Sequence, residues 1–279
     1  MSILCPICPH GCSLKAGQFG ICGARRGTEN EVVADNYGKV TSLSLDPIEK
    51  KPLARFHPGS TILSVGSYGC NLSCGFCQNS NISRIRGDSR PSRIATYSPQ
   101  ELVEYALSMR SRKNVGLAYT YNEPLVGYEF VLDTARLIHE AGLKNVIVSN
   151  GYINEEPFTR LLDHLDAANI DLKAFNQGFY DSVGAPKGLV TVKRSIELAV
   201  ASIHVEVTTL VIPGLNDGDS EIDDLAAWLA GIDSEIPLHL TRFHPAYRML
   251  TVPPTPRSTI RRLADIAKQH LSHVYPGNM

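Results

Sequence analysis

Short apolar runs recur between residues 61 and 243, and each is followed by a helical pattern or by a gap long enough to hold a helix. Runs of this kind, bounded by turn residues, are typical of buried strands. Strands that alternate with helices predict βα units around a parallel sheet. The expected strands are TILSVG (61–66), VGLAYTY (115–121), NVIVS (145–149), ANIDLKAF (168–175), HVEVTTLVI (204–212) and LHLTRF (238–243).

Start signals predict helices between these strands. Ser98 precedes Pro99 and is followed by Glu101, which is the pattern of a capping box. Thr255 before Pro256 predicts the same kind of cap for the last helix. The pattern alone leaves both a doubly wound sheet and a barrel open. In either fold the active site is expected at the carboxyl ends of the strands.

The 279-residue chain has seven cysteines, which fall into two groups. An odd number of clustered cysteines favours metal binding or catalysis in a reducing compartment over disulfides. Residues 1–60 also lack the βα pattern. We therefore expect a metal-binding lobe with a β-rich lead-in over 1–60 and a βα core over 61–279. The first group is Cys5, Cys8, Cys12 and Cys22, and the second is Cys70, Cys74 and Cys77.

Charge and hydropathy narrow the function classes. The formal net charge is −1, so no overall positive field attracts nucleic acid, and the densest basic stretch (84–93) is expected to be a solvated loop. No apolar run approaches the length of a membrane span, and residues 1–10 lack the pattern of a secretory signal. We expect a cytoplasmic protein that binds neither membrane nor nucleic acid.

The sequence GCNLSCGFCQN places three cysteines in one short loop directly after the first expected strand. Thiolates bind iron–sulfur clusters, and four ligands complete a [4Fe–4S] cubane. Three cysteines leave one position open, which is useful where another molecule binds there, as at catalytic zinc. The alternative is a structural site with a remote fourth ligand. The position of the loop at a strand end favours the open site.

This loop resembles the cysteine loop of the radical S-adenosylmethionine (SAM) superfamily. The chain is similar to the pyruvate formate-lyase-activating-enzyme-like branch, and in particular to the radical SAM enzyme of the AmmeMemoRadiSam system. The resemblance implies a partial (β/α)6 TIM-type barrel with an N-terminal Cys-rich metal-binding lobe. The similar stretches are CPHGCSLKAGQFGICGARR, YGKVTSLSLDPIEKKPLARFHPGS, TYNEP, NGY, DLKAF, LVIPGLND, TRFHPAYRM and VYPGN.

The resemblance also implies the chemistry. Cys70, Cys74 and Cys77 would hold a [4Fe–4S] cluster, and SAM would chelate its fourth iron. A low-potential donor protein, such as flavodoxin or ferredoxin, would supply the electron that cleaves SAM to methionine and a 5′-deoxyadenosyl radical. The radical would abstract hydrogen from an unidentified substrate. In the activating branch that substrate is a glycine of a partner enzyme; the alternatives are a small molecule or a non-enzymatic iron–sulfur or zinc scaffold.

The matching strand ends imply contacts with SAM. Phe76 would pack near the adenine, and Glu123, with Asn122 beside it, would bind the methionine ammonium. Lys173 would meet the methionine carboxylate, and Asp171 would orient Lys173 or hold a monovalent cation. Asp171 and Lys173 share one face of a strand, so a structural ion pair is the alternative. The other expected contacts are Asn150, Gly151, Val211 and Pro213.

Polar residues at strand ends are candidates for the catalytic or substrate side of the site. A histidine there could face the radical or the substrate, although a lone histidine is as often structural. These candidates are Tyr121, Arg242 and His244.

The N-terminal cysteines form a second candidate metal site. Four thiolates within residues 5–22 can complete a site without other ligands. Zinc and a second [4Fe–4S] cluster both take four thiolates, and the spacing does not choose between them. The Cys-Pro pairs favour a cluster, and His10 is expected beside the ligands rather than among them.

Overall fold

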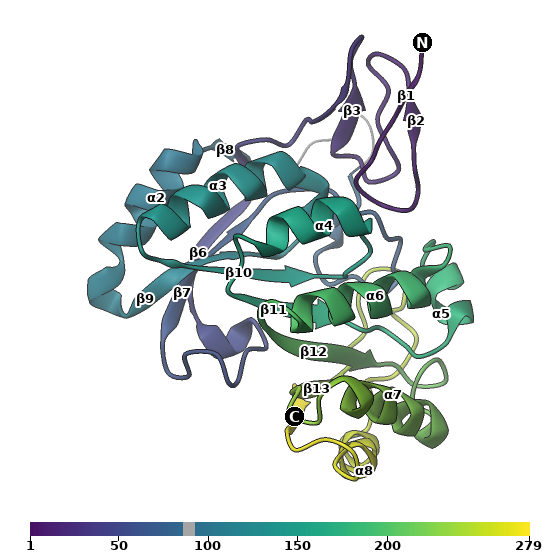
Figure 1. Ribbon diagram of the computed structural model, residues 1–279. Helices are drawn as coiled ribbons and strands as arrows, with labels where there is room; N and C mark the ends of the chain where they lie inside the picture. The colour runs from purple at the N-terminus through teal and green to yellow at the C-terminus, as the bar shows by residue number, and fades with distance from the viewer. Residues whose placement is uncertain (86–92) are drawn as a thin grey trace.

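The computed structural model describes residues 1–85 and 93–279 (Figure 1). Residues 86–92, which hold most of the basic stretch expected to be a solvated loop, lie outside the described residues. The main sheet has eight strands in the order β14–β13–β12–β11–β10–β9–β7–β6. Neighbours in it pair in parallel, except for the antiparallel pair of β6 and β7. The fold is a partial (β/α)6 barrel.

The strands expected from the apolar runs are all confirmed, with ends that shift by a few residues. The lead-in contributes β6, which joins the sheet although it lies within residues 1–60, and β14 is a parallel edge strand that the sequence did not predict. The bounds are β6 Ser42–Pro47, β7 Thr61–Gly66, β9 Asn114–Tyr119, β10 Lys144–Ser149, β11 Ala167–Asp171, β12 His204–Val211, β13 Leu238–Arg242 and β14 Val274–Gly277.

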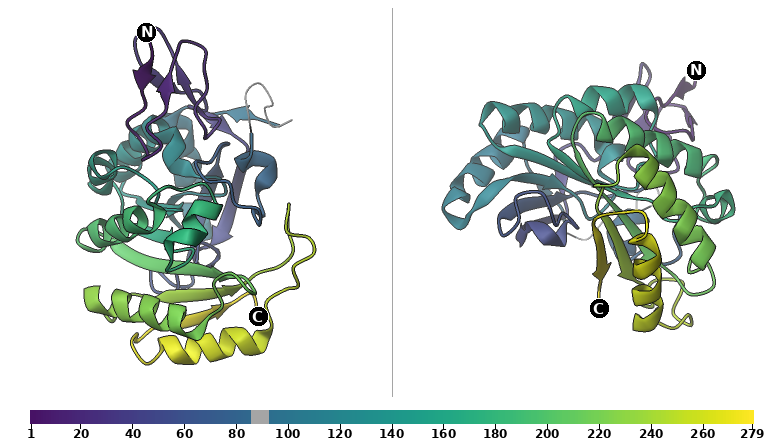
Figure 2. Two further views of the ribbon diagram at one scale, coloured as in Figure 1. Left: turned by 90° about the vertical axis from the view of Figure 1, so that its right-hand side faces the viewer. Right: turned by 60° about the horizontal axis from the view of Figure 1, so that its bottom comes forward.

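Helices cover the outer side of the curved sheet (Figure 2). The capping box is confirmed, because Ser98 accepts from the Glu101 N–H and the Glu101 carboxylate accepts from the Ser98 N–H. The cap expected at Thr255 is wrong: Pro256 is the N-cap, and the Thr255 hydroxyl accepts from the Phe243 N–H instead. The helices are α1 Ser80–Ser83, α2 Pro99–Ser108, α3 Tyr128–Glu140, α4 Glu155–Leu162, α5 Gln177–Ser182, α6 Gly188–Val200, α7 Asp219–Ile232 and α8 Arg257–Ala267. None of the helices in the described part of the chain has the length and hydropathy of a membrane span.

The N-terminal lobe is built from very short strand pairs and lies beside α4 (Figure 1). Arg25, which is 2% exposed, ties it to α3 through a bidentate ion pair with Glu129 at 2.7 and 2.8 Å. The pairs are β1 Ile3–Leu4 with β2 Ser13–Leu14, and β3 Arg25–Gly27 with β4 Val32–Ala34; beyond the lobe, β5 Lys39–Val40 pairs with β8 Ala95–Thr96.

The segment between β6 and β7 packs against the parallel strands of the barrel. Ile48 and Leu53 are fully buried and pack against Ala167 and other small or branched residues of the strands. Asn169 of β11 donates a hydrogen bond to the Pro52 carbonyl at 2.8 Å. Side chains two apart on a strand share a face. Asn169 therefore lies on the same face as Asp171 and closer to the amino end of β11.

Glu206 of β12 fixes this segment to the barrel wall. Its carboxylate accepts from the backbone N–H groups of Ala54 (2.9 Å) and Arg55 (2.7 Å). The imidazoles of His204 (3.0 Å) and His239 (2.6 Å) donate to the same carboxylate. Burial alone would raise the pKa of Glu206, but these hydrogen bonds outweigh burial and lower the pKa to about 2.

Glu206→Gln is expected to lower the free energy of unfolding at pH 7 by about 3 kcal/mol, because an amide leaves some of these donors unpaired. An ordinary glutamate has a pKa of 4.5, and the folded value is about 2. The wild-type advantage should be complete above the ordinary pKa and disappear as the pH falls through the folded one. Denaturant unfolding from pH 7 to pH 2 measures it, with exposed Glu104→Gln as the control. A difference that does not change with pH would contradict this account.

Candidate active site

A cavity of about 420 Å³ lies at the carboxyl ends of the parallel strands. Its size suits a small molecule. The cysteine loop after β7 forms one wall, and the residues that follow β9, β10 and β11 form the others. Most of the expected site residues line this one cavity: Cys70, Cys74, Phe76, Cys77, Tyr121, Asn122, Glu123, Asn150, Asp171 and Lys173.

Glu123 is the buried carboxylate of this cavity. Its Oε1 accepts from the Ser149 hydroxyl (2.8 Å) and the Leu125 N–H (3.1 Å), and its Oε2 accepts from the Asn150 N–H (2.8 Å). Burial raises the pKa of Glu123 to about 7, although these hydrogen bonds oppose the rise. A carboxylate held in this way has lone pairs left for a cation, and a cation beside it would favour the charged form.

Lys173 places an ammonium in the lining of the same cavity. Its Nζ donates to Asp171 Oδ2 at 2.9 Å, and the two side chains are 15% and 35% exposed. Burial alone would lower the pKa of Lys173, but the charge of Asp171 and the hydrogen bond to it raise the pKa above its ordinary value. The ion pair that the sequence offered as an alternative is therefore present. The ammonium keeps two further donors for a ligand.

The cysteine loop lines the cavity with Cys70, Cys74 and Cys77. The Cys70 Sγ accepts from the Leu72 N–H at 3.4 Å and lies 3.7 Å from Asn150 Nδ2. Burial raises the pKa of the Cys70 and Cys74 thiols. All seven cysteines of the chain are unpaired. The three thiols thus share one cavity with the carboxylates of Glu123 and Asp171 and with the ammonium of Lys173.

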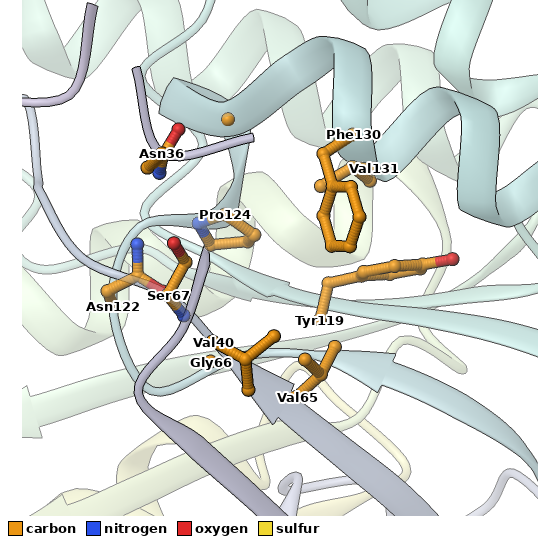
Figure 3. A pocket seen from close by; sticks show the side chains of 11 residues that line it. Asn36, Val40, Val65, Gly66, Ser67, Tyr119, Asn122, Pro124, Phe130 and Val131 are labelled. Atoms are coloured by element: carbon orange, nitrogen blue, oxygen red, sulfur yellow. The ribbon is translucent and has the colours of Figure 1, made fainter. Parts of the chain in front are cut away.

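A second cavity, behind the loop, is too small to be the active site. It holds about 20 Å³, which is room for about one water molecule, and lies between β7, β9 and α3 (Figure 3). Val65, Tyr119, Phe130 and Val131 make most of its lining apolar. Asn36 Oδ1 is buried there without a hydrogen-bond partner among the described residues.

Comparisons with known proteins agree with this geometry. The family model described as the radical SAM superfamily matches residues 64–229. The chain belongs to the radical SAM superfamily. It is 41% identical over 283 residues to the uncharacterized protein MJ0808 of Methanocaldococcus jannaschii, covering 99% of this chain and 81% of that protein. It is 26% identical over 184 residues to the pyruvate formate-lyase-activating enzyme of Clostridium pasteurianum, covering 63% of this chain and 72% of the enzyme.

The fold is also similar to that of solved radical SAM enzymes. A radical SAM methyltransferase from Sphaerobacter thermophilus matches with a TM-score of 0.57 and 19% identity, over 79% of this chain and 67% of that one. Membership of the superfamily implies a [4Fe–4S] cluster and SAM. The cavity suits both, because three thiols from one loop are the ligand set of such a cluster and Glu123 and Lys173 have the charges that complement methionine.

Two of the expected residues that line the cavity of the cysteine loop, Tyr121 and Asn122, form hydrogen bonds to other parts of the chain. Asn122 accepts from the Ser67 N–H (2.9 Å) and donates to the Gly69 carbonyl (3.1 Å). Its side chain therefore ties the end of β9 to the cysteine loop. Tyr121 has a positive φ of 72°, and its hydroxyl donates to Asp46 at 2.7 Å. Tyr121 thus joins β9 to β6 across one wall.

Five expected residues are not among the described residues that line the radical SAM cavity. Arg242 donates to the Thr255 carbonyl at 2.8 Å and holds the chain after β13. His244 is exposed. Gly151 has a positive φ of 66° and forms the turn after β10. These three, together with Val211 and Pro213, keep their expected roles as predictions only.

Thr208 is a polar residue of the cavity that the sequence did not single out. It lies beside Asp171 in the register of β11 and β12, lines the cavity and is 7% exposed. Its Oγ1 is buried without a hydrogen-bond partner among the described residues. Neighbouring Thr209 donates to the Leu172 carbonyl at 2.7 Å. The sequence does show that Thr208 shares a strand face with Glu206 and Leu210, because alternate residues of a strand point to the same side. It does not show which of the two faces of the strand points to the cavity.

The N-terminal cysteines line a separate small cavity together with His10 and Arg25. Burial raises the pKa of the Cys8 thiol to about 12, although hydrogen bonds from the His10 backbone and the Asn71 side chain oppose the rise. Among the described residues, no three His, Cys, Asp or Glu side chains surround a position suited to a single metal ion. The cysteines of this cavity are Cys5, Cys8, Cys12 and Cys22.

Proposed function

We propose that this chain reductively cleaves SAM at a [4Fe–4S] cluster and uses the resulting 5′-deoxyadenosyl radical to abstract hydrogen from a substrate. One observation supports this most directly: the three-cysteine loop shares a cavity with Glu123, which follows β9, and with Lys173, which follows β11. A non-enzymatic iron–sulfur or zinc scaffold would not need these charged groups. When bound, the cluster would supply one electron to the sulfonium of SAM.

The residues of the chain bind and orient SAM in this proposal. Cys70, Cys74 and Cys77 hold the cluster. Glu123 accepts a hydrogen bond from the methionine ammonium, and Lys173 donates to the methionine carboxylate. Phe76, which is 7% exposed and lies against Phe179 with ring centroids 6.0 Å apart, supplies an apolar surface near the adenine; Asn150 keeps the loop beside Glu123.

Anaerobic reconstitution followed by reduction with dithionite tests this function. The protein should take up about four irons at the cysteine loop. With SAM it should then release 5′-deoxyadenosine and methionine, which chromatography measures. Omitting dithionite is the control, because cleavage depends on the electron. A protein with a complete cluster that binds SAM and never cleaves it under reduction would refute the proposal.

A second candidate, within the same chemistry, is an activase that installs a glycyl radical on a partner enzyme. The similarity to a pyruvate formate-lyase-activating enzyme supports it. A small-molecule substrate is the alternative. An organic radical signal in a glycyl-radical enzyme encoded near the gene, absent when its radical glycine is replaced by alanine, would favour the activase.

We further propose a flavodoxin or ferredoxin as electron donor and a cytoplasmic location, where the unpaired cysteines stay reduced.

Thr208→Val is expected to weaken SAM binding roughly 3- to 10-fold, the equivalent of one neutral hydrogen bond. The free energy of unfolding should not fall, because the hydroxyl has no described partner to lose and valine has the same shape. Thr209→Val is the matched control: it should lower stability by about 1–3 kcal/mol, since the Leu172 carbonyl loses its donor, and leave binding unchanged. Equilibrium dialysis and denaturant unfolding measure both. Equal losses of stability with unchanged binding would remove Thr208 from the site.

A further inference from the structure

The N-terminal lobe contacts the radical cysteine loop directly. The Cys70 N–H donates to the Cys22 carbonyl at 3.1 Å, so one hydrogen bond joins a cysteine of each group. The imidazole of His10, which stands between Cys8 and Cys12, is bonded to the Asn71 carbonyl at 2.8 Å. His10 of the lobe and Asn71, which follows Cys70, therefore meet at this interface.

The backbone fit at this interface is close. Gly69 has a positive φ of 92°, and a Cβ atom added there would lie 2.7 Å from the Ala24 Cβ and 2.8 Å from the Cys22 carbonyl oxygen. A side chain at this position would push the loop away from the lobe. The position of Cys70 is thus set against the chain segment that carries Cys22.

Asn71 extends the contact to Asn150, which lines the cavity of the cysteine loop. It is 2% exposed, donates to the Tyr152 carbonyl at 2.7 Å, and accepts from Asn150 Nδ2 at 2.9 Å. The same Asn150 nitrogen lies 3.7 Å from the Cys70 sulfur. The His10 ring also packs edge-on against Tyr152, with centroids 5.3 Å apart. A shift of the lobe would therefore move the ligand loop and the end of β10 together.

The lobe has little structure of its own to hold this position. β1 and β2 have two residues each, and β3 and β4 have three each. A unit of this size rarely buries enough apolar surface to order itself without a metal or a cross-link. Its four cysteines line one cavity and form no disulfide. What these thiols bind then decides how well the lobe is ordered.

We propose that Cys5, Cys8, Cys12 and Cys22 bind a thiolate-ligated metal centre, and that its binding is thermodynamically linked to cluster binding at Cys70, Cys74 and Cys77 through the contacts of Cys22 and His10. The linkage rests on the proposed function only in requiring a cluster at the second group. An ordered lobe presents the Cys22 carbonyl and His10 in the positions that hold the loop ready for its ligands. Linkage of this kind is reciprocal: each site must change the affinity of the other by the same factor.

Chelator titration of the full chain measures the linkage. The protein is reconstituted anaerobically with ferrous iron and sulfide, and in parallel with zinc, to distinguish the two metals at the lobe. Cys12→Ser should weaken iron binding at the radical loop about 10-fold. Cys74→Ala should weaken metal binding at the lobe by the same factor. Tyr37→Phe is the control, because it removes the hydrogen bond to Asp133 (2.7 Å) without touching either cysteine group.

His10→Phe is the decisive variant, because it keeps all seven thiols and the aromatic packing on Tyr152 but removes the bond to Asn71. Both sites should still bind metal, and the mutual effect should become smaller than in the wild type, because the contact of Cys22 remains and that of His10 is lost. The electron paramagnetic resonance spectrum of the reduced radical cluster should change. Unchanged iron affinity in Cys12→Ser, with SAM cleavage intact in the wild type, would overturn the linkage alone. A lobe that binds neither iron nor zinc would also overturn it. A wild-type loop that holds no cluster would overturn the linkage and the proposed function together.

Discussion

Cys74→Ala is expected to remove the cluster from the radical loop and to abolish reductive cleavage of SAM. The remaining thiols of the loop cannot complete the ligand set of a [4Fe–4S] cluster, even with SAM on the fourth iron. Iron analysis should show about four fewer irons per chain, and 5′-deoxyadenosine should fall below detection. The barrel should stay folded, because Cys74 is 8% exposed and the loss of one buried sulfur costs about 1 kcal/mol.

Ser73→Ala is the matched control in the same loop. It removes the hydrogen bond from the Ser73 hydroxyl to the Val183 carbonyl (2.9 Å) and leaves every thiol in place. Iron content and cleavage should remain near wild type. If Cys74→Ala kept its full iron content and still cleaved SAM, the three-cysteine loop would not be the cluster site.

The strands and most helix starts could be predicted because their signals are local. A buried parallel strand reads as a short apolar run, and the Ser98 box is recognisable within four residues. Thr255 also precedes a proline but does not cap the helix, since its buried hydroxyl bonds to β12 and to Phe243. β14 was missed because VYPG carries a proline and a glycine, which are rare in central strands but tolerated at an edge.

Much of the candidate site could also be predicted, because parallel strands bring their carboxyl ends to one edge. Glu123, Asn150 and Lys173 are far apart in sequence yet line one cavity for this reason. Side-chain direction could not be predicted. Thr208 lines the cavity, whereas the Arg242 side chain donates to the Thr255 carbonyl outside it. Both orientations depend on the register of the strands rather than on the residue type.

The docking of the lobe on the loop lay beyond the sequence for a different reason. Cys22 and Cys70 are separated by the whole lead-in, and no periodicity relates them. Only the folded chain shows that the Cys70 N–H donates to the Cys22 carbonyl. Only the folded chain shows, too, that Gly69 lies so close to Cys22 and Ala24 that a side chain has no room there. The division into four and three cysteines was visible in the sequence, but their contact was not.

Lys173→Met is expected to weaken SAM binding about 10- to 150-fold, because it removes one charge-assisted contact worth roughly 1.5–3 kcal/mol and keeps the length of the side chain. The ion pair with Asp171 does not exclude this contact. An ammonium has three donors, and Asp171 Oδ2 is the one partner that the described residues give to Nζ. The cluster should assemble as in the wild type, since no thiol has changed.

The structural alternative makes the opposite prediction for the same variant. If Lys173 served only its ion pair, Lys173→Met would lower the melting temperature through the unpaired Asp171 and leave SAM affinity nearly unchanged. Asp171 is 35% exposed, so water would take over part of the lost partner and the loss of stability should be small. Lys144→Met supplies the comparison, because it breaks an ion pair with Asp166 (2.7 Å) at the amino end of β10, away from the cavity. Isothermal titration with reconstituted protein and thermal unfolding, run on both variants, separate the two roles of Lys173. A loss of SAM binding confined to Lys173→Met assigns the ammonium to SAM. A loss of stability shared by both variants, with unchanged SAM affinity, removes Lys173 from the SAM site.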